Sequence, residues 1–171
     1  MIRRRLKFIL SFVIMATPVA AQQQLHLKPG VKVSAILADN NLALDGRSEI
    51  TVYVSNRDST AVAIPRRLGL NQGFYIKVTD QSGRQVQPSI PYAISPPGPP
   101  PTTANDVVLL KSDELYGRRF DILVRNLVPN PGKYTLRVAL KTRVPADSVI
   151  SQIINSDDGP YWSNAVPLLV R

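Results

Sequence analysis

Few residues of this chain have the type and spacing that enzyme chemistry requires. A hydrolase that works through a serine or cysteine nucleophile also needs a base and an orienting group. The 171 residues include no cysteine and one histidine, His26, which lies near the N-terminus. A histidine-based triad is therefore not expected. We predict no catalytic residue and no enzymatic activity.

Two pairs of adjacent acids are the other candidates for chemistry. Asp157 and Asp158 stand in an Asp-Asp-Gly-Pro sequence, and Asp113 and Glu114 stand in a polar connection. Glycoside hydrolysis needs two facing carboxylates, whereas adjacent acids in turns usually form the turn or face water. The Asp-x-Asp-x-Asp-Gly spacing of a calcium loop is missing. With a single histidine and no cysteine, the sequence predicts no metal site and no cofactor.

Two arginine doublets are candidates for binding an anionic partner: Arg66 with Arg67, and Arg118 with Arg119. Such a partner could be a lipid head group, a polysaccharide or a nucleic acid. Aromatic residues make up 6% of the chain, and none interleaves with the arginines as stacking platforms for nucleic acid would. We therefore expect no nucleic acid partner. Plain solvation of charged loops is the alternative interpretation of the doublets.

Tyr161 and Trp162 form an aromatic pair near the C-terminus and are further candidates for contact with a partner. We expect the indole of Trp162 to cap one end of the core, with its N–H group hydrogen-bonded. The alternative is an exposed aromatic pair on a binding edge.

The stretch 88–103 is rich in proline, which fixes φ and cannot donate a hydrogen bond to a strand ladder. Its prolines are Pro88, Pro91, Pro96, Pro97, Pro99, Pro100 and Pro101. We expect an extended loop with polyproline II character that connects parts of the fold. The alternative is that the last five of these prolines are recognised by an aromatic-lined groove on a partner.

The N-terminus has the pattern of an export signal. Arginines at positions 3–5 precede an apolar run from Leu6 to Ala16, and the small residues Val19 and Ala21 stand three and one positions before Gln22. We expect cleavage between Ala21 and Gln22. The apolar run is too short for a membrane-spanning helix, which needs roughly 20 residues. The sequence therefore predicts an exported protein, periplasmic or secreted, without a transmembrane anchor after cleavage.

Cleavage would also change the charge of the chain. Four of the 21 basic residues lie in the predicted signal, which leaves 17 against 12 acidic residues, or a net charge of +5 in place of +9. This is an ordinary charge for a soluble small domain. The remaining 150 residues, 22–171 of the 171, correspond to a single domain.

The stretch 131–142 has the clearest structural pattern. After a Pro-Gly turn, Tyr134, Leu136, Val138 and Leu140 alternate with polar residues. Alternation with one apolar face is typical of a half-buried strand in an antiparallel sheet. Similar patterns predict strands at 31–37, 48–55, 60–64, 74–79, 84–87, 106–111, 119–125 and 163–170. The stretch 112–115 is compatible with a helical turn or a polar turn, and 148–155 with a short helix or a strand.

No stretch shows sustained helical periodicity, so the crossover helices of a parallel α/β sheet are not expected. We predict an all-β fold: an immunoglobulin-like antiparallel β-sandwich of about 7–9 strands. Pro167 on the outer face of the last strand indicates an edge position or the end of its ladder.

Two motifs resemble known families. Pro131-Gly132-Lys133-Tyr134 looks like the turn into the penultimate strand of immunoglobulin-like and fibronectin-type domains. This resemblance implies that Tyr134 forms a tyrosine corner, with its hydroxyl bonded to nearby backbone. The ending from Trp162 to Val166 is similar to the last strand of small bacterial exported immunoglobulin-like domains, including the BsuPI type of proteinase inhibitor. The cysteine pair of antibody domains is absent.

The sequence thus predicts a non-catalytic binding or structural module whose partner is another envelope or extracellular protein. Its oligomeric state is not predicted. Two alternatives stay open. The chain could regulate an extracytoplasmic protease, with the segment Pro96–Pro101 as its contact, or it could assemble by strand addition at an exposed edge such as Ala165–Val170.

Overall fold

The computed structural model describes residues 30–70, 72–87, 104–142 and 160–171. Several predictions lie outside these ranges: the export signal, His26, the proline-rich stretch 88–103, the stretch 148–155, and Asp157 with Asp158.

One sheet, here sheet A, contains three long antiparallel strands in the order β1-β3-β9. They are β1 (Val31–Leu37), β3 (Arg47–Asn56) and β9 (Leu115–Leu123). From Ile50 onward, every second side chain of β3 is buried, which places Ile50, Val52 and Val54 in the core. The alternation predicted for this strand is confirmed.

Sheet B has the order β2-β12-β10-β6-β5. Its strands are β2 (Asn41–Leu42), β12 (Val166–Val170), β10 (Gly132–Leu140), β6 (Gly73–Asp80) and β5 (Gly69–Leu70). Two further short strands join it: β7 (Gln85–Val86) pairs with β6, and β11 (Tyr161–Trp162) pairs with β10. The pairs β2–β12 and β5–β6 are parallel, whereas the sequence predicted antiparallel pairing throughout.

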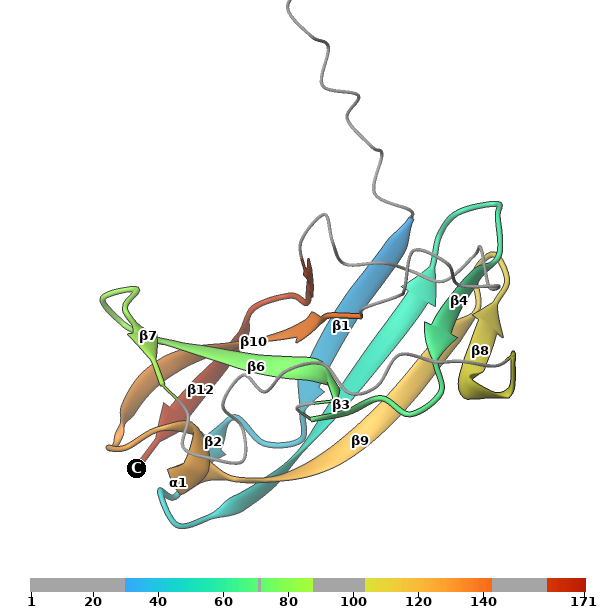
Figure 1. The fold of residues 1–171 in the computed structure, drawn as a ribbon. Helices are drawn as coiled ribbons and strands as arrows, with labels where there is room; N and C mark the ends of the chain where they lie inside the picture. The colour runs from blue at the N-terminus through green and yellow to red at the C-terminus, as the bar shows by residue number, and fades with distance from the viewer. Residues whose placement is uncertain (1–29, 71, 88–103, 143–159) are drawn as a thin grey trace, which may run out of the picture.

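A separate two-stranded sheet stands at one end of the molecule, at the right in Figure 1. It consists of β4 (Val62–Pro65) and β8 (Val107–Leu110), which pair in antiparallel fashion. A 3-10 turn (Ala104–Asp106) precedes β8, and one short helix, α1 (Val124–Leu127), follows β9.

The two main sheets enclose one hydrophobic core. Figure 1 shows β1, β3 and β9 side by side in one layer, with β6 and β10 crossing them in a second layer. Phe74 of β6 and Phe120 of β9 meet between the layers, edge to face, with ring centroids 5.9 Å apart. This arrangement is a β-sandwich, and it confirms the predicted immunoglobulin-like fold class.

Tyr134 forms the predicted corner at the start of β10. Its hydroxyl donates a hydrogen bond to the Asn130 carbonyl oxygen at 2.8 Å. The ring lies over Gly132, where an added Cβ atom would come within 3.3 Å of ring atoms. Packing therefore explains the glycine of the Pro-Gly-x-Tyr sequence, because a larger residue at position 132 would push the Tyr134 ring away.

The stretch around β9 differs from its prediction at both ends. The strand begins at Leu115 instead of Arg119, and Val124 begins helix α1 instead of continuing the strand. Gly117 and Arg118 hide the alternation in the sequence, because neither is an apolar residue of the core. In the stretch 112–115, residues 112–114 form the polar turn, with Asp113 at φ 60°, and no helical turn is present there.

Candidate functional site

Arg66 lies just after β4, where its side chain is fixed by backbone oxygens. Its Nε atom donates to the Asn105 carbonyl at 2.9 Å, and its Nη2 atom donates to the Val107 carbonyl at 3.2 Å. Its backbone N–H donates to the Asp106 carbonyl at 2.7 Å. These bonds tie the chain after β4 to the segment before β8, and Arg66 remains exposed to solvent.

Arg118 of β9 reaches the same place from sheet A. Its Nη2 atom donates to the Arg66 carbonyl at 2.9 Å, and the Tyr116 hydroxyl donates to the same oxygen at 2.9 Å. The Arg118 guanidinium carbon lies 5.4 Å from the centroid of the Tyr116 ring, within range of a cation–π interaction. Tyr116 and Arg118 thus both bind the Arg66 carbonyl oxygen, and the Tyr116 ring packs against the Arg118 guanidinium group.

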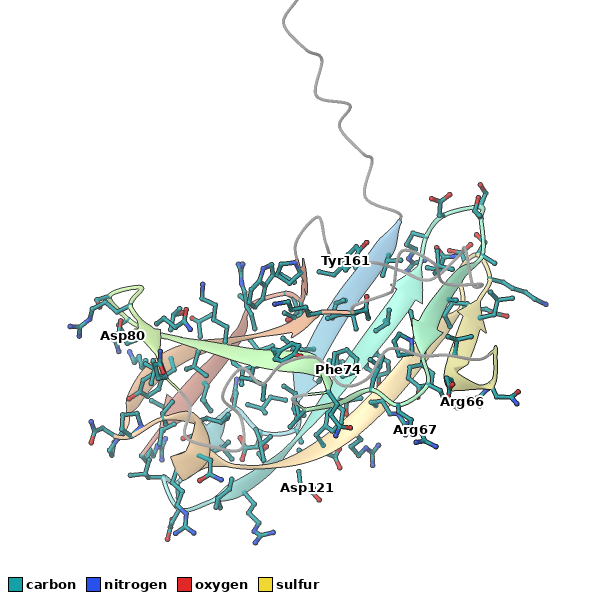
Figure 2. All side chains as sticks on the ribbon, in the orientation of Figure 1. Arg66, Arg67, Phe74, Asp80, Asp121 and Tyr161 are labelled. Atoms are coloured by element: carbon teal, nitrogen blue, oxygen red, sulfur yellow. The ribbon has the colours of Figure 1, made fainter. Side chains whose placement is uncertain are left out.

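Arg119 does not join this group. Alternate side chains of a strand point to opposite faces, and Arg119 pairs with Glu49 on β3 at 3.0 Å. The two doublets therefore do not form one patch. Arg66, Arg67 and Arg118 form what we call the arginine surface, and Figure 2 shows Arg66 and Arg67 at the end of the molecule that carries β4 and β8.

The arginine surface keeps its positive charge. The hydrogen bonds that hold Arg66 and Arg118 go to neutral carbonyl oxygens. None of the three ion pairs between described residues includes an arginine of this surface. Arg67 is exposed, and the next residue, Leu68, is 4% exposed and anchors the segment in the core. The surface therefore presents preorganised donors to an anionic group.

Tyr161 and Trp162 have opposite environments. Tyr161 is 9% exposed and belongs to the core, whereas Trp162 is 43% exposed. The prediction that the indole of Trp162 caps the core is therefore wrong. The ring instead carries Lys77 above it, with Nζ 5.6 Å from the centroid.

The acids Asp113 and Glu114 have structural roles. Asp113 pairs with Arg57 at 3.0 Å, and the Glu114 carboxylate accepts a hydrogen bond from the Lys111 N–H at 2.8 Å. Both acids thereby stabilise the connection between β8 and β9. In the described part of the chain, no three His, Cys, Asp or Glu side chains gather in a way that could hold a metal ion.

Two of the described groups have shifted pKa values. A hydrogen bond from the Ser82 hydroxyl, 2.6 Å away, is the largest cause that lowers the pKa of Asp80, in the turn between β6 and β7. Burial raises the pKa of Tyr75 above its ordinary value of 10.0, and the nearby Gly73 backbone offsets part of this rise. Neither group lies in the arginine surface, and Figure 2 shows Asp80 at the opposite end of the molecule from Arg66.

A groove runs between the outer side of β1 and the beginning of β12. It has a volume of about 380 Å³ and is lined by residues 35–40 and 164–167. Asn164 spans it: the Ala35 N–H donates to Oδ1 at 2.9 Å, and Nδ2 donates to the Ala35 carbonyl at 3.1 Å. No sequence pattern pointed to Asn164, because an asparagine in a connection carries no sign of its partner.

The edge predicted for strand addition is misplaced. β12 is an interior strand that lies between β10 and β2. Leu169 and Val170 pair with β2, and the Leu169 N–H donates to the Asn40 carbonyl. Pro167 faces the same side of β12 as Leu169, and a proline has no N–H group to donate to a further strand. The stretch Ala165–Val170 therefore cannot receive a further strand along its length.

Comparison with known proteins gives no family. No family model matches the chain, and no curated protein matches it. Among solved structures, the chain is similar to a β-glucosidase from Erythrobacter marinus, with 12% identity and a TM-score of 0.44, over 84% of this chain and 16% of the enzyme. The chain thus spans about one sixth of that enzyme's length.

Two smaller structures are covered more fully. The CARDB domain of the PF1109 protein from Pyrococcus furiosus, solved in complex with di-metal ions, has 12% identity and a TM-score of 0.40, over 85% of this chain and 90% of that domain. AvmM, which catalyses macrocyclization in alchivemycin A biosynthesis, has 11% identity and a TM-score of 0.38, over 83% of this chain and 89% of AvmM. No BsuPI-type inhibitor is among these structures. Likenesses this distant say nothing about the activity of the chain.

Among the described residues, no helix is long and apolar enough to cross a membrane.

Proposed function

We propose that the chain is an exported, non-catalytic β-sandwich module that binds another envelope or extracellular protein. In this proposal the arginine surface is the contact, and the partner presents acidic side chains or a C-terminal carboxylate. One observation carries the proposal: carbonyl oxygens hold the guanidinium groups of Arg66 and Arg118 in place at 2.9 to 3.2 Å, and among the described residues no carboxylate forms an ion pair with either group.

This arrangement favours binding for two physical reasons. A side chain that is already ordered loses less conformational entropy when a partner binds. A guanidinium group that forms no ion pair with a described carboxylate can make a charge-assisted hydrogen bond to a partner, which is about twice as strong as a neutral one. Arg66 and Arg118 can therefore meet an acidic partner with little rearrangement of their own side chains.

Site-specific photo-crosslinking in the exporting cell tests this proposal. A photoreactive amino acid at position 67 is expected to capture one protein of the envelope or medium. The same amino acid at position 125 is the control, because Arg125 is an exposed arginine of α1, which lies at the other end of the molecule (Figure 1). Equal capture from both positions, or none from position 67, would contradict the arginine surface as the contact.

Regulation of an extracytoplasmic protease is a second proposal. It rests on the run of prolines between Pro96 and Pro101, since a proline-rich segment is conformationally restricted and loses little entropy when it binds a cleft. Deletion of residues 96–101 should abolish binding to a protease and leave the melting temperature nearly unchanged. Binding that survives the deletion would exclude the loop as the inhibitory element.

A further inference from the structure

The outer face of sheet B carries basic side chains on both of its long central strands, β6 and β10. Alternate residues of a strand point to opposite faces, and the even-numbered residues from Phe74 to Val78 and from Leu136 to Leu140 are buried in the core. The odd-numbered residues therefore face outward, and none of them on these two strands is an acid. The basic ones are Lys77 of β6, Lys133 and Arg137 of β10, and Lys141 just after β10. None of the three ion pairs between described residues includes these side chains.

Trp162 reaches the same face from the other side of β10. On β11 it lies opposite Ala139, whereas Lys77 lies on β6. The Lys77 Nζ atom is 5.6 Å from the centroid of the Trp162 ring, so these two side chains meet across the outer face of β10. Ala139, the small residue of β10 at this point, is 2% exposed, while Trp162 itself is 43% exposed. We call the four basic residues and Trp162 together the basic face.

The cations of the basic face are too far apart to converge on one small anion. Lys133, Arg137 and Lys141 stand four positions apart, and a strand rises about 3.3 Å per residue, so neighbouring ones are about 13 Å apart along β10. A single phosphate or carboxylate cannot form hydrogen bonds over that distance. Lys77, opposite Arg137 on the next strand, extends the set in a second direction. The basic face is therefore complementary to an extended surface with many negative charges.

The exposed tryptophan indicates what kind of surface this is. Tryptophan is enriched where proteins meet the boundary between water and lipid, because its ring is apolar and its N–H group is polar. Lysine and arginine side chains are attracted to membranes that contain anionic lipids, and each one strengthens binding about fivefold. Cations and a tryptophan on one face therefore match the head-group region of an anionic bilayer.

We infer that the basic face binds the surface of a bilayer rich in anionic lipids, with Trp162 at the level of the head groups. The chain lies on the membrane through sheet B, and sheet A, the other layer of the sandwich in Figure 1, is turned away from the lipid. The basic face shares no residue with the arginine surface. A failure of membrane binding would therefore leave the proposed protein contact untouched, and the reverse also holds.

Tryptophan fluorescence of the mature chain, which lacks the basic export signal, tests the inference without any substitution. Trp162 is the only tryptophan in the sequence. On addition of vesicles of equal parts phosphatidylglycerol and phosphatidylcholine, its emission should move to shorter wavelength, and added salt should reverse this shift. Vesicles of phosphatidylcholine alone should have no effect. An emission that anionic vesicles leave unchanged, or that both kinds of vesicle shift equally, would overturn the inference.

A pair of charge reversals locates the contact. Arg137→Glu, in the middle of the basic face, should weaken co-sedimentation with the anionic vesicles by about tenfold or more. Lys32→Glu makes the same change in net charge at an exposed position of β1, on the outer face of sheet A, and should stay within about twofold of wild type. Equal losses would contradict the inference, because net charge alone would then explain binding. If Arg137→Glu folds poorly, Lys133→Glu, at the exposed start of β10, replaces it with the same expected loss.

Two further measurements separate the lipid surface from other anionic partners. Heparin, a soluble sulfated polysaccharide, carries many negative charges but has no head-group region for an indole ring, so it should leave the Trp162 emission nearly unchanged. Heparin that shifts the emission as far as vesicles do would refute a membrane as the partner. Arg67→Glu should bind vesicles as wild type does, whereas a loss equal to that of Arg137→Glu would place the lipid contact at the arginine surface instead.

Discussion

At the scale of single residues, the hydroxyl groups of two tyrosines differ in whether they are hydrogen-bonded. Tyr134 donates to the Asn130 carbonyl at 2.8 Å. Tyr75 is 4% exposed, and its hydroxyl lacks a hydrogen-bond partner among the described residues. The same change, tyrosine to phenylalanine, should therefore have opposite consequences at the two positions.

Tyr134→Phe should lower the free energy of unfolding by about 1 kcal/mol, the net value of one hydrogen bond. Chemical denaturation monitored by tryptophan fluorescence measures this change, and the slope of the transition should not change. An unaltered free energy of unfolding would mean that the corner hydrogen bond contributes nothing to stability.

Tyr75→Phe should leave the free energy of unfolding unchanged or raise it by up to about 1 kcal/mol, because it removes a buried polar group that is not paired. The pKa of Tyr75 is raised by burial, so its hydroxyl ionises in the unfolded chain before it ionises in the folded one. Wild type therefore loses stability as the pH rises above about 10, and the variant lacks this part of the loss. A cost above about 1 kcal/mol at pH 7 would show that the hydroxyl does have a partner.

At the scale of elements, Asn56 joins sheet A to the β4–β8 pair. It is the last residue of β3 and is completely buried. Its Nδ2 atom donates to the Thr60 carbonyl at 2.9 Å and to the Leu110 carbonyl of β8 at 3.1 Å, and its Oδ1 atom accepts from the Asp58 N–H at 3.0 Å. The sequence indicated only a polar turn at Asn56. A buried asparagine looks the same in a sequence as a solvated one, because its hydrogen-bond partners are not visible there.

Asn56→Ala should lower the free energy of unfolding by about 3 kcal/mol, because it leaves the Thr60 and Leu110 carbonyl groups and the Asp58 N–H group without their partner. Thermal unfolding measures the change. Ser59→Ala, in the exposed connection that follows, is the control and should have little effect. A loss equal to that of the control would contradict the role of Asn56 as the joint between β3 and the β4–β8 pair.

Asp80 stabilises the connection between β6 and β7. Its Oδ1 atom accepts hydrogen bonds from the Ser82 and Arg84 N–H groups at 2.9 and 3.0 Å, and Oδ2 pairs with Arg84 at 3.1 Å. Since the pKa of Asp80 is lowered below 3.8, its contribution is present above that pH and is lost as the pH falls through the folded-state value. Asp80→Asn should melt at a lower temperature at pH 7, and the difference should vanish in acid. A difference that does not depend on pH would contradict the role of the charge.

Alternation predicted the strands that bury one face, and it failed where the pattern is short or interrupted. β3 and β10 were identified because their apolar residues recur at every second position. The strands β2, β5 and β11 have two residues each, which is too short for any pattern to repeat. The start of β9 was missed because Gly117 and Arg118 interrupt the apolar alternation there.

The candidate site was likewise predictable only where its pattern is local in the sequence. The sequence could nominate Arg66, Arg67 and Arg118, because paired arginines are visible in a linear chain. The sequence could not separate Arg119 from these residues, because the ion pair between Arg119 and Glu49 depends on the register between β3 and β9. The contact between Asn164 and Ala35 could not be predicted either, because the two residues are 129 positions apart and nothing in the sequence marks either of them as special.

At the scale of the whole molecule, export is the first property to test. The mature protein recovered from the exporting cell should begin at Gln22, with the residues up to Ala21 removed. Intact-mass measurement of the protein from the envelope and from the medium gives the answer. Full-length protein confined to the cytoplasm would contradict export, and with it the expectation of an envelope or extracellular partner.

The arginine surface lies at one end of the sandwich, where Figure 2 shows Arg66 and Arg67. Binding through this surface should depend on salt, because charges near a surface are screened within about 8 Å at physiological ionic strength.

The most direct test of the central proposal compares two charge reversals at exposed arginines. With the protein captured from position 67 as ligand, Arg67→Glu should weaken the dissociation constant by about tenfold or more, because like charges across an interface repel. Arg125→Glu makes the same change in net charge and should leave the dissociation constant within about twofold of wild type. Equal losses for both variants, or no loss for Arg67→Glu, would show that the arginine surface is not the binding site.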